Sequence, residues 1–111
     1  QGHRTMSKNY PDNWVVLQIA TDGDAYLYKI LGGWSGSFTW GSSWRLNSGI
    51  VKVEESELYW TFHGVSGSQY VCHKKAYGLK MNNSGICKQI LEEFPDTVTM
   101  MRKETDWANL V

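Results

Sequence analysis

Lysine dominates the ionisable side chains between Leu58 and Leu91, a stretch that contains no aspartate or glutamate. Cations can follow the phosphates of a single-stranded nucleic acid while aromatic rings stack on its bases. The stretch therefore predicts a nucleic-acid contact through Lys74, Lys75, Tyr77, Lys80 and Lys88. The alternative is an ordinary solvated face, with the tyrosines packed in the core or paired across strands.

Three tryptophans stand in a segment that otherwise has the composition of a loop. Residues 32–51 read GGWSGSFTWGSSWRLNSGIV and hold Trp34, Trp40 and Trp44. Glycine and serine favour bends, whereas an indole is costly to leave in water. The rings are expected either to fold onto the core as a lid or to form an interface for a flat or apolar partner.

The same segment carries Arg45, its only charged residue, and Asn47. A guanidinium and an amide beside a glycine-rich bend suit the recognition of phosphates or base edges. They could equally hold the loop through hydrogen bonds to its own backbone. Both residues are therefore candidate nucleic-acid contacts with a structural alternative.

Motifs of catalysis and metal binding are not apparent. The sequences Gly-Trp-Ser-Gly-Ser and Gly-Val-Ser-Gly-Ser place the second glycine one position too early for a nucleophile elbow, and no glycine-rich phosphate loop occurs. Cys72 and Cys87, with His63 and His73, lack the paired spacing of a zinc site, so buried free thiols are expected. We expect a non-enzymatic protein without cofactor or metal.

Length and charge limit the possible classes. With 111 residues and a net charge of zero, the chain has room for one domain, and any attraction to nucleic acid must come from a local patch. The sequence has no apolar run of the roughly 20 residues that a membrane helix needs, which predicts a soluble, intracellular protein. Residues 1–5 are interpreted as an expression-tag remnant, and residues 6–111 as a single domain.

The elements that would position these residues are mainly β-strands. Alternating and β-branched patterns predict strands at residues 14–19, 25–31, 48–53, 58–63 and 69–74. Short turns between most of them favour a small, strongly bent antiparallel sheet or barrel of five strands, with segment 32–51 as its one long excursion.

One helix is expected after the strands, at about residues 84–94. Asn82, Asn83 or Ser84 offers an N-cap oxygen, and Pro95 stops the helix. Its apolar side chains share one face and are Ile86, Ile90, Leu91 and Phe94. Residues 97–101 could add a sixth strand or an interface segment, and residues 105–107 are expected to be a polar tail.

Four phrases together resemble a known family: Tyr-Lys-Ile-Leu-Gly-Gly-Trp-Ser-Gly from residue 28, Ser-Trp-Arg-Leu-Asn-Ser-Gly-Ile-Val-Lys-Val-Glu-Glu from residue 43, Tyr-Gly-Leu-Lys-Met-Asn-Asn from residue 77, and Thr-Asp-Trp from residue 105. The chain resembles small proteins of marine, cyanophage-type phages, known mainly from ocean metagenomes. The resemblance implies an Sm-like barrel that assembles into a homo-oligomeric ring in the host cytoplasm. The helix follows the strands here, unlike the usual Sm arrangement, and no Sm RNA-binding motif is visible, so no site residue is carried over.

The leading expectation is a phage-encoded binding module that contacts single-stranded RNA or DNA as a ring. The alternative is a protein-interaction module that docks a host or virion partner through a tryptophan-rich surface. A third hypothesis is capture of a small aromatic or nucleotide ligand by the tryptophan segment.

Overall fold

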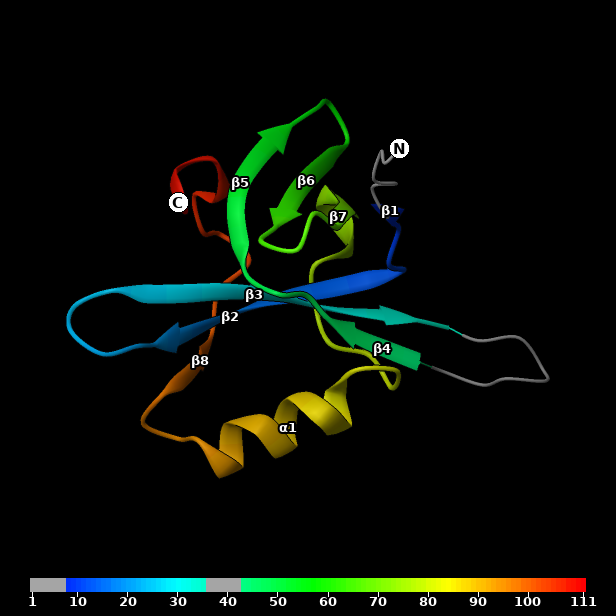
Figure 1. Cartoon of the computed structure of the whole chain (residues 1–111). Helices are drawn as coiled ribbons and strands as arrows, with labels where there is room; N and C mark the ends of the chain where they lie inside the picture. The colour runs from blue at the N-terminus through cyan, green and yellow to red at the C-terminus, as the bar shows by residue number, and fades with distance from the viewer. Residues whose placement is uncertain (1–7, 36–42) are drawn as a thin grey trace, which may run out of the picture.

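The computed structural model describes residues 8–35 and 43–111, and the expected tag residues lie outside this part. Strands in the described part are β1 (Lys8–Asn9), β2 (Asn13–Ala20), β3 (Tyr26–Trp34), β4 (Ser43–Leu46), β5 (Ile50–Glu55), β6 (Tyr59–Gly64), β7 (Gln69–His73) and β8 (Val98–Met100) (Figure 1). Its helices are the short 3-10 turns η1 (Lys74–Ala76) and η2 (Trp107–Asn109), and α1 (Ser84–Glu93).

Within the described residues these strands form two four-stranded sheets, ordered β1-β7-β6-β5 and β4-β3-β2-β8. The expected β class is thus confirmed, and all five predicted strands are present. Closure into one five-stranded Sm- or SH3-like barrel is not confirmed, because the described strands stay in two sheets. Three further strands, β1, β4 and β8, supply the additional pairing.

The sheet β4-β3-β2-β8 is the middle of three layers. In Figure 1 the other sheet lies above it and α1 below it. Side chains of β2 alternate between the two cores, with Trp14 and Val16 on the side of the second sheet and Val15 and Leu17 on the side of the helix. A strand with both faces buried reads as an unbroken apolar run, which is the pattern of residues 14–17.

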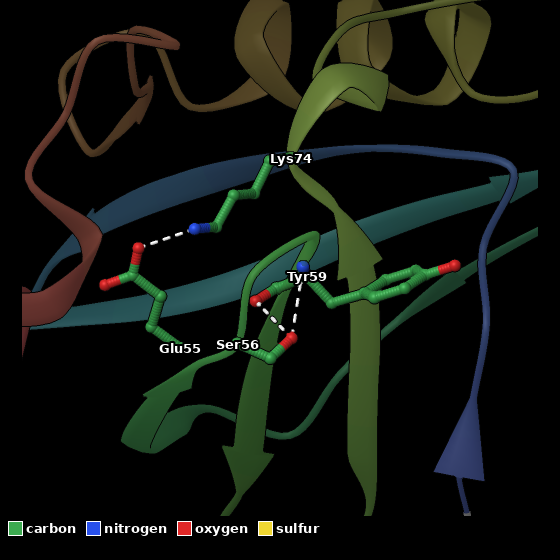
Figure 2. Close-up of polar contacts among 4 residues, drawn as sticks. All are labelled: Glu55, Ser56, Tyr59 and Lys74. Atoms are coloured by element: carbon green, nitrogen blue, oxygen red, sulfur yellow. Dashed lines mark hydrogen bonds and ion pairs between the residues drawn. The ribbon is translucent and has the colours of Figure 1, made fainter.

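The expected hairpins are formed. Gly23 adopts a positive φ of 83° in the turn between β2 and β3, as the Asp-Gly pair predicts. Strands β5 and β6 are joined by a turn in which the N–H of Ser56 donates to the carbonyl of Tyr59 at 2.9 Å. The Ser56 hydroxyl adds side-chain contacts within that turn, drawn in Figure 2. Gly67, with φ of 96°, turns the chain from β6 to β7.

The interpretation of segment 32–51 as one long excursion is wrong. Strand β3 continues through Gly32 and Gly33 to Trp34 and pairs with β4, where Gly32 lies opposite Arg45. Residues 32–34 and 43–46 of the segment are therefore antiparallel strands in one sheet, and its last two residues begin β5 of the other sheet. Glycine is typical of loops, but in a strand it also marks close approach of another group.

Helix α1 is confirmed at Ser84–Glu93, with two differences in detail. Its fully buried residue is Cys87, whereas Phe94 lies beyond the helix and is 49% exposed. Asn83 stands at the N-cap position, but its side chain makes no capping bond. Strand β8 confirms the possible sixth strand and pairs with β2. Among the described residues, no helix is both long and apolar enough to cross a membrane.

Candidate nucleic-acid interface

A hollow of about 420 Å³ opens between β1 and β4, which are edge strands of the two different sheets. The residues that line it are Lys8, Asn9, Tyr10, Trp34, Ser43, Trp44 and Arg45. The hollow therefore brings Arg45 together with two of the three tryptophans predicted from the sequence. It also adds residues from the N-terminal lead-in.

Arg45 is held in place across the gap between the sheets. Its Nη1 donates to Oδ1 of Asn9 at 2.8 Å, and the amide nitrogen of Asn9 donates to the carbonyl of Gln69 on β7 at 3.2 Å. Asn9 is only 8% exposed. A buried amide that makes two hydrogen bonds has little conformational freedom, so it fixes the position of the guanidinium that it contacts.

The aromatic lining residues have two different roles. The ring N–H of Trp34 donates to the carbonyl of Tyr10 at 3.0 Å, and the ring lies 5.9 Å from Cζ of Arg45 and packs against the core. Trp34 is thus the lid that one sequence hypothesis predicted. Trp44 and Tyr10 remain 47% and 58% exposed. Trp40 lies outside the described residues.

The electrostatic character of the hollow is positive. Lys8 and Arg45 contribute cations, and none of the described residues that line it carries a carboxylate. Burial raises the pKa of the neighbouring Tyr70 hydroxyl, and the positive charge of Arg45 opposes that rise. The nearby Asp12 carboxylate accepts a bond from the backbone N–H of Ser35 at 2.7 Å. Cations beside exposed rings can bind a flat anionic ligand.

Asn47 belongs to the scaffold. Its side-chain Oδ1 accepts a hydrogen bond from the backbone N–H of Ile30 at 2.8 Å, and its backbone N–H donates to the carbonyl of Ile30 at 3.0 Å. The residue is 4% exposed. Its Nδ2 has no hydrogen-bond partner in the described part of the chain. Of the two roles that the sequence left open, the structure favours the internal hydrogen bonds.

The predicted lysines do not gather into one face with Arg45. Lys74 forms an ion pair with Glu55 at 2.5 Å, which Figure 2 shows, and lies 5.0 Å from the ring centre of Trp60. Glu55 lies on β5. Because β5 pairs with β6 and β6 pairs with β7, this glutamate comes within reach of Lys74, although the sequence around Lys74 is free of acids. Lys80 and Lys88 are exposed on the turn before α1 and on α1 itself.

A second hollow, of about 440 Å³, collects another part of the predicted set. It is lined by Lys74, Lys75, Tyr77, Lys103 and Glu104. Two of these residues, Lys103 and Glu104, follow β8 and were not predicted as site residues. With Glu104 in its lining and Lys74 paired to Glu55, this hollow is less cationic than its lysines alone suggest.

Tyr77 is a structural residue whose ring also borders the second hollow. Its hydroxyl donates to the carbonyl of Met101 at 2.5 Å and accepts from the N–H of Val16 at 3.1 Å. Its ring meets that of Trp14 edge-on, with centres 4.7 Å apart. Burial raises the pKa of Tyr77 to about 12. Such a ring is not free to stack on a base.

Sequence reasoning missed Lys8, Asn9 and Tyr10 as lining residues. Their segment reads as a polar lead-in, because β1 is only two residues long and pairs in parallel with the distant β7. The sequence signal for a binding role in this segment was limited to one aromatic residue, Tyr10, next to Pro11 in a polar context. Nothing local indicates that this segment meets β4.

No protein-family model, curated protein or solved structure matches the chain.

Proposed function

We propose that this protein is a non-enzymatic module that binds single-stranded RNA or DNA. The observation that carries the proposal is the hollow between β1 and β4, where Arg45 and Lys8 stand beside the exposed rings of Trp44 and Tyr10. Binding of single strands needs this combination, because cations neutralise phosphates and rings stack on unpaired bases. A neutral protein can bind in this way when the charge is local.

The lysines of the second hollow take a supporting role in this proposal. Lys75 and Lys103 offer ammonium groups to backbone phosphates, whereas Tyr77 is engaged in the interior. Phosphate contacts of this kind position a strand without reading its sequence. Lys80 and Lys88 remain predicted contacts of the same, unspecific type.

Docking of a host or virion protein through a tryptophan-rich surface is less well supported. Of the two predicted tryptophans that the structure describes, Trp34 is bonded to Tyr10 and packs against the core, which leaves Trp44 as the exposed one. Protein hot spots cluster several desolvated anchors. One exposed indole beside two cations suits a nucleic acid better.

The proposal includes the assembly that the sequence resemblance implies, a ring of Sm-like subunits encoded by a phage and acting in the host cytoplasm. Both sheets end in edge strands, β1 and β5 in one and β4 and β8 in the other, whose outer backbone groups pair with no strand of the described chain. Unpaired edges are available to neighbouring subunits. Light scattering of the purified protein measures the mass, and a monomer at all concentrations contradicts the ring.

Fluorescence anisotropy of a short labelled oligonucleotide tests binding. We expect binding at low salt that weakens steeply as salt rises, with a log–log slope of about −2 if roughly three phosphates are contacted. Arg45→Gln removes the charge while keeping an amide that can still bond Asn9, and it should weaken binding about 10- to 150-fold, because charge-assisted bonds contribute about 1.5–3 kcal/mol.

Lys52→Gln is the matched control, since Lys52 is an exposed cation on β5, at the opposite edge of the sheet from β1. It removes the same charge and should leave affinity close to that of the native protein. No change in anisotropy at low salt with either RNA or DNA would contradict the proposed function.

A further inference from the structure

We infer that the hollow between β1 and β4 is a pocket for one nucleoside-phosphate unit, in which the base stacks on Trp44 and Tyr10 and the phosphate contacts Arg45 and Lys8. This inference rests on the proposed function and specifies its central site. The unit can be a nucleotide within a strand, the end of a strand or a free nucleotide, because all three present the same base and phosphate.

Preorganisation is the first argument. The guanidinium of Arg45 is tied by Asn9 to β7, and the Trp34 ring that it faces is tied to the carbonyl of Tyr10. These bonds join the edges of both sheets into one rigid rim. A ligand that enters does not have to order these groups, which lowers the cost of binding.

Size is the second argument. A volume of about 420 Å³ falls in the range of small-molecule pockets, about 300–1,000 Å³, and suits one nucleotide. A base inside a duplex is already stacked on both faces, so it has no free face for Trp44. The pocket therefore selects unpaired nucleotides.

The chemistry of the lining decides between kinds of ligand. Arg45 presents a planar fork of donors, of which Nη1 contacts Asn9, and such a fork matches phosphate oxygens. A neutral peptide would leave two cations without partners, because no carboxylate lines the described rim. An inorganic anion would leave the rings unused. A phosphorylated planar ligand satisfies both features.

Little in the pocket can distinguish one base from another. The amide of Asn9 is already engaged with Arg45 and Gln69, so the other uncharged polar groups of the described lining are the Ser43 hydroxyl and the polar ends of the two stacking residues, the Tyr10 hydroxyl and the Trp44 ring N–H. Stacking tolerates every base, since each has a flat face. We therefore expect comparable affinity for purine and pyrimidine nucleotides, with purines somewhat tighter because they stack over a larger area.

Nuclear magnetic resonance of the native protein tests the pocket directly. The six tryptophans give separate indole N–H signals, and Trp44 is assigned by the signal that the Trp44→Leu variant loses. Adenosine monophosphate should shift the Trp44 signal and leave the signal of buried Trp107 unchanged. Adenosine and inorganic phosphate, each carrying half of the recognised chemistry, should bind at least about 5-fold more weakly.

Two exposed tyrosines provide a matched pair of variants. Tyr10 lines the pocket and is 58% exposed, whereas Tyr26 is 55% exposed at the other end of β3. Tyr10→Leu should weaken both nucleotide and oligonucleotide binding about 5- to 100-fold, as expected for a lost stacking partner. Tyr26→Leu should leave both affinities unchanged. Circular dichroism and melting curves confirm that the variants are folded.

The outcomes separate the pocket from the proposed function. One outcome is that oligonucleotides bind the native protein, and that the Tyr10→Leu and Trp44→Leu variants bind them as tightly as the Tyr26→Leu variant does. This result would rule out the pocket, and the proposed binding of single strands would then take place through other cations. If adenosine monophosphate binds and oligonucleotides do not, the proposed function is wrong and the site is one for free nucleotides. Equal binding of adenosine and its monophosphate overturns the role of Arg45 and Lys8.

Discussion

Three buried asparagines, Asn13, Asn82 and Asn83, form one cluster of side-chain hydrogen bonds. Asn13 shares its amide hydrogens among the carbonyl of Gly78 and the side-chain oxygens of Asn82 and Asn83, each at 3.1 Å. Asn82 donates back to Asn13 at 2.7 Å. Buried amides that satisfy one another are specific in geometry. Asn82 and Asn83 thus hold Asn13 in place by hydrogen bonds and do not cap the helix.

This asparagine cluster requires glycine at position 33. A Cβ there would lie 2.1 Å from Oδ1 of Asn82, which is only 7% exposed and cannot swing away without leaving Asn13. We expect Gly33→Ala to destabilise the protein by about 2–4 kcal/mol, from overpacking and a broken buried hydrogen bond. Urea unfolding followed by fluorescence measures the loss.

Gly85→Ala is the control for this substitution. Gly85 lies in α1, and a Cβ there has nothing within 4 Å. Alanine should stabilise the helix by up to about 1 kcal/mol. The two alanine variants are therefore expected to move the unfolding midpoint in opposite directions, and a Gly33→Ala midpoint equal to the native one would rule out the close contact.

Individual strands were predictable because their patterns are local. The apolar and β-branched runs of β2, β5 and β6 and the Asp-Gly turn before β3 need no distant information. Strand β4 was missed because its glycine-rich partner in β3 reads as a loop. Gly32 and Gly33 of β3 have little room for a Cβ, because Pro11 and Asn82 approach them from elsewhere in the chain. Close approach of this kind leaves no local signal beyond the glycines themselves.

Tyr77 links three elements and illustrates how a residue's role depends on its neighbours. Its hydroxyl bonds β2 at Val16 and the segment after β8 at Met101. Tyr77→Phe leaves one buried donor and one buried acceptor without this partner, so we expect a loss of about 1–3 kcal/mol at neutral pH. Thermal or urea unfolding gives the difference.

The pH dependence of that variant follows from the raised pKa. Burial raises the pKa of Tyr77 from 10.0 to about 12, so the folded state favours the neutral phenol. Its contribution is complete below about pH 10 and is lost as the pH rises through 12. The stability gap between the native protein and Tyr77→Phe should narrow over this window. Tyr26→Phe, at an exposed tyrosine, should show no gap at neutral pH, and a constant gap for Tyr77→Phe would contradict the assignment.

Charge patterns along the chain were less informative than strand patterns, because pairing of strands changes which charges are neighbours. The acid-free stretch around Lys74 predicted a basic face, yet the two hairpins place β5 and β7 on either side of β6, and Glu55 on β5 forms an ion pair with Lys74. The hollow beside Arg45 depends likewise on β1, a two-residue strand that pairs far along the chain. Arg45 and Trp44 were recognisable by type, but Asn9 and Tyr10, which line the same hollow, were not.

The C-terminal segment completes the core that the two sheets enclose. The sequence interpretation of residues 105–107 as a polar tail is wrong for Trp107, which is 3% exposed. Its ring centre lies 5.4 Å from that of Tyr77 and 5.5 Å from that of Trp14, and it also contacts Phe62 at 6.1 Å. The turn η2 that carries it packs against β5. The last residues thus join both sheets.

Trp107→Ala should therefore cost about 3–5 kcal/mol, the range for a buried aromatic reduced to alanine. Small domains are stable by about 5–15 kcal/mol in total, so a variant with this loss should melt far below the native protein. Trp44→Ala is the matched control, because Trp44 is 47% exposed and a surface change of this kind usually stays within about 0.5 kcal/mol. Trp44→Ala should keep the native melting temperature while losing affinity for oligonucleotides, which separates the indole that holds the fold from the one proposed to bind. Equal melting temperatures for the two variants would mean that the C-terminal segment does not hold the sheets together.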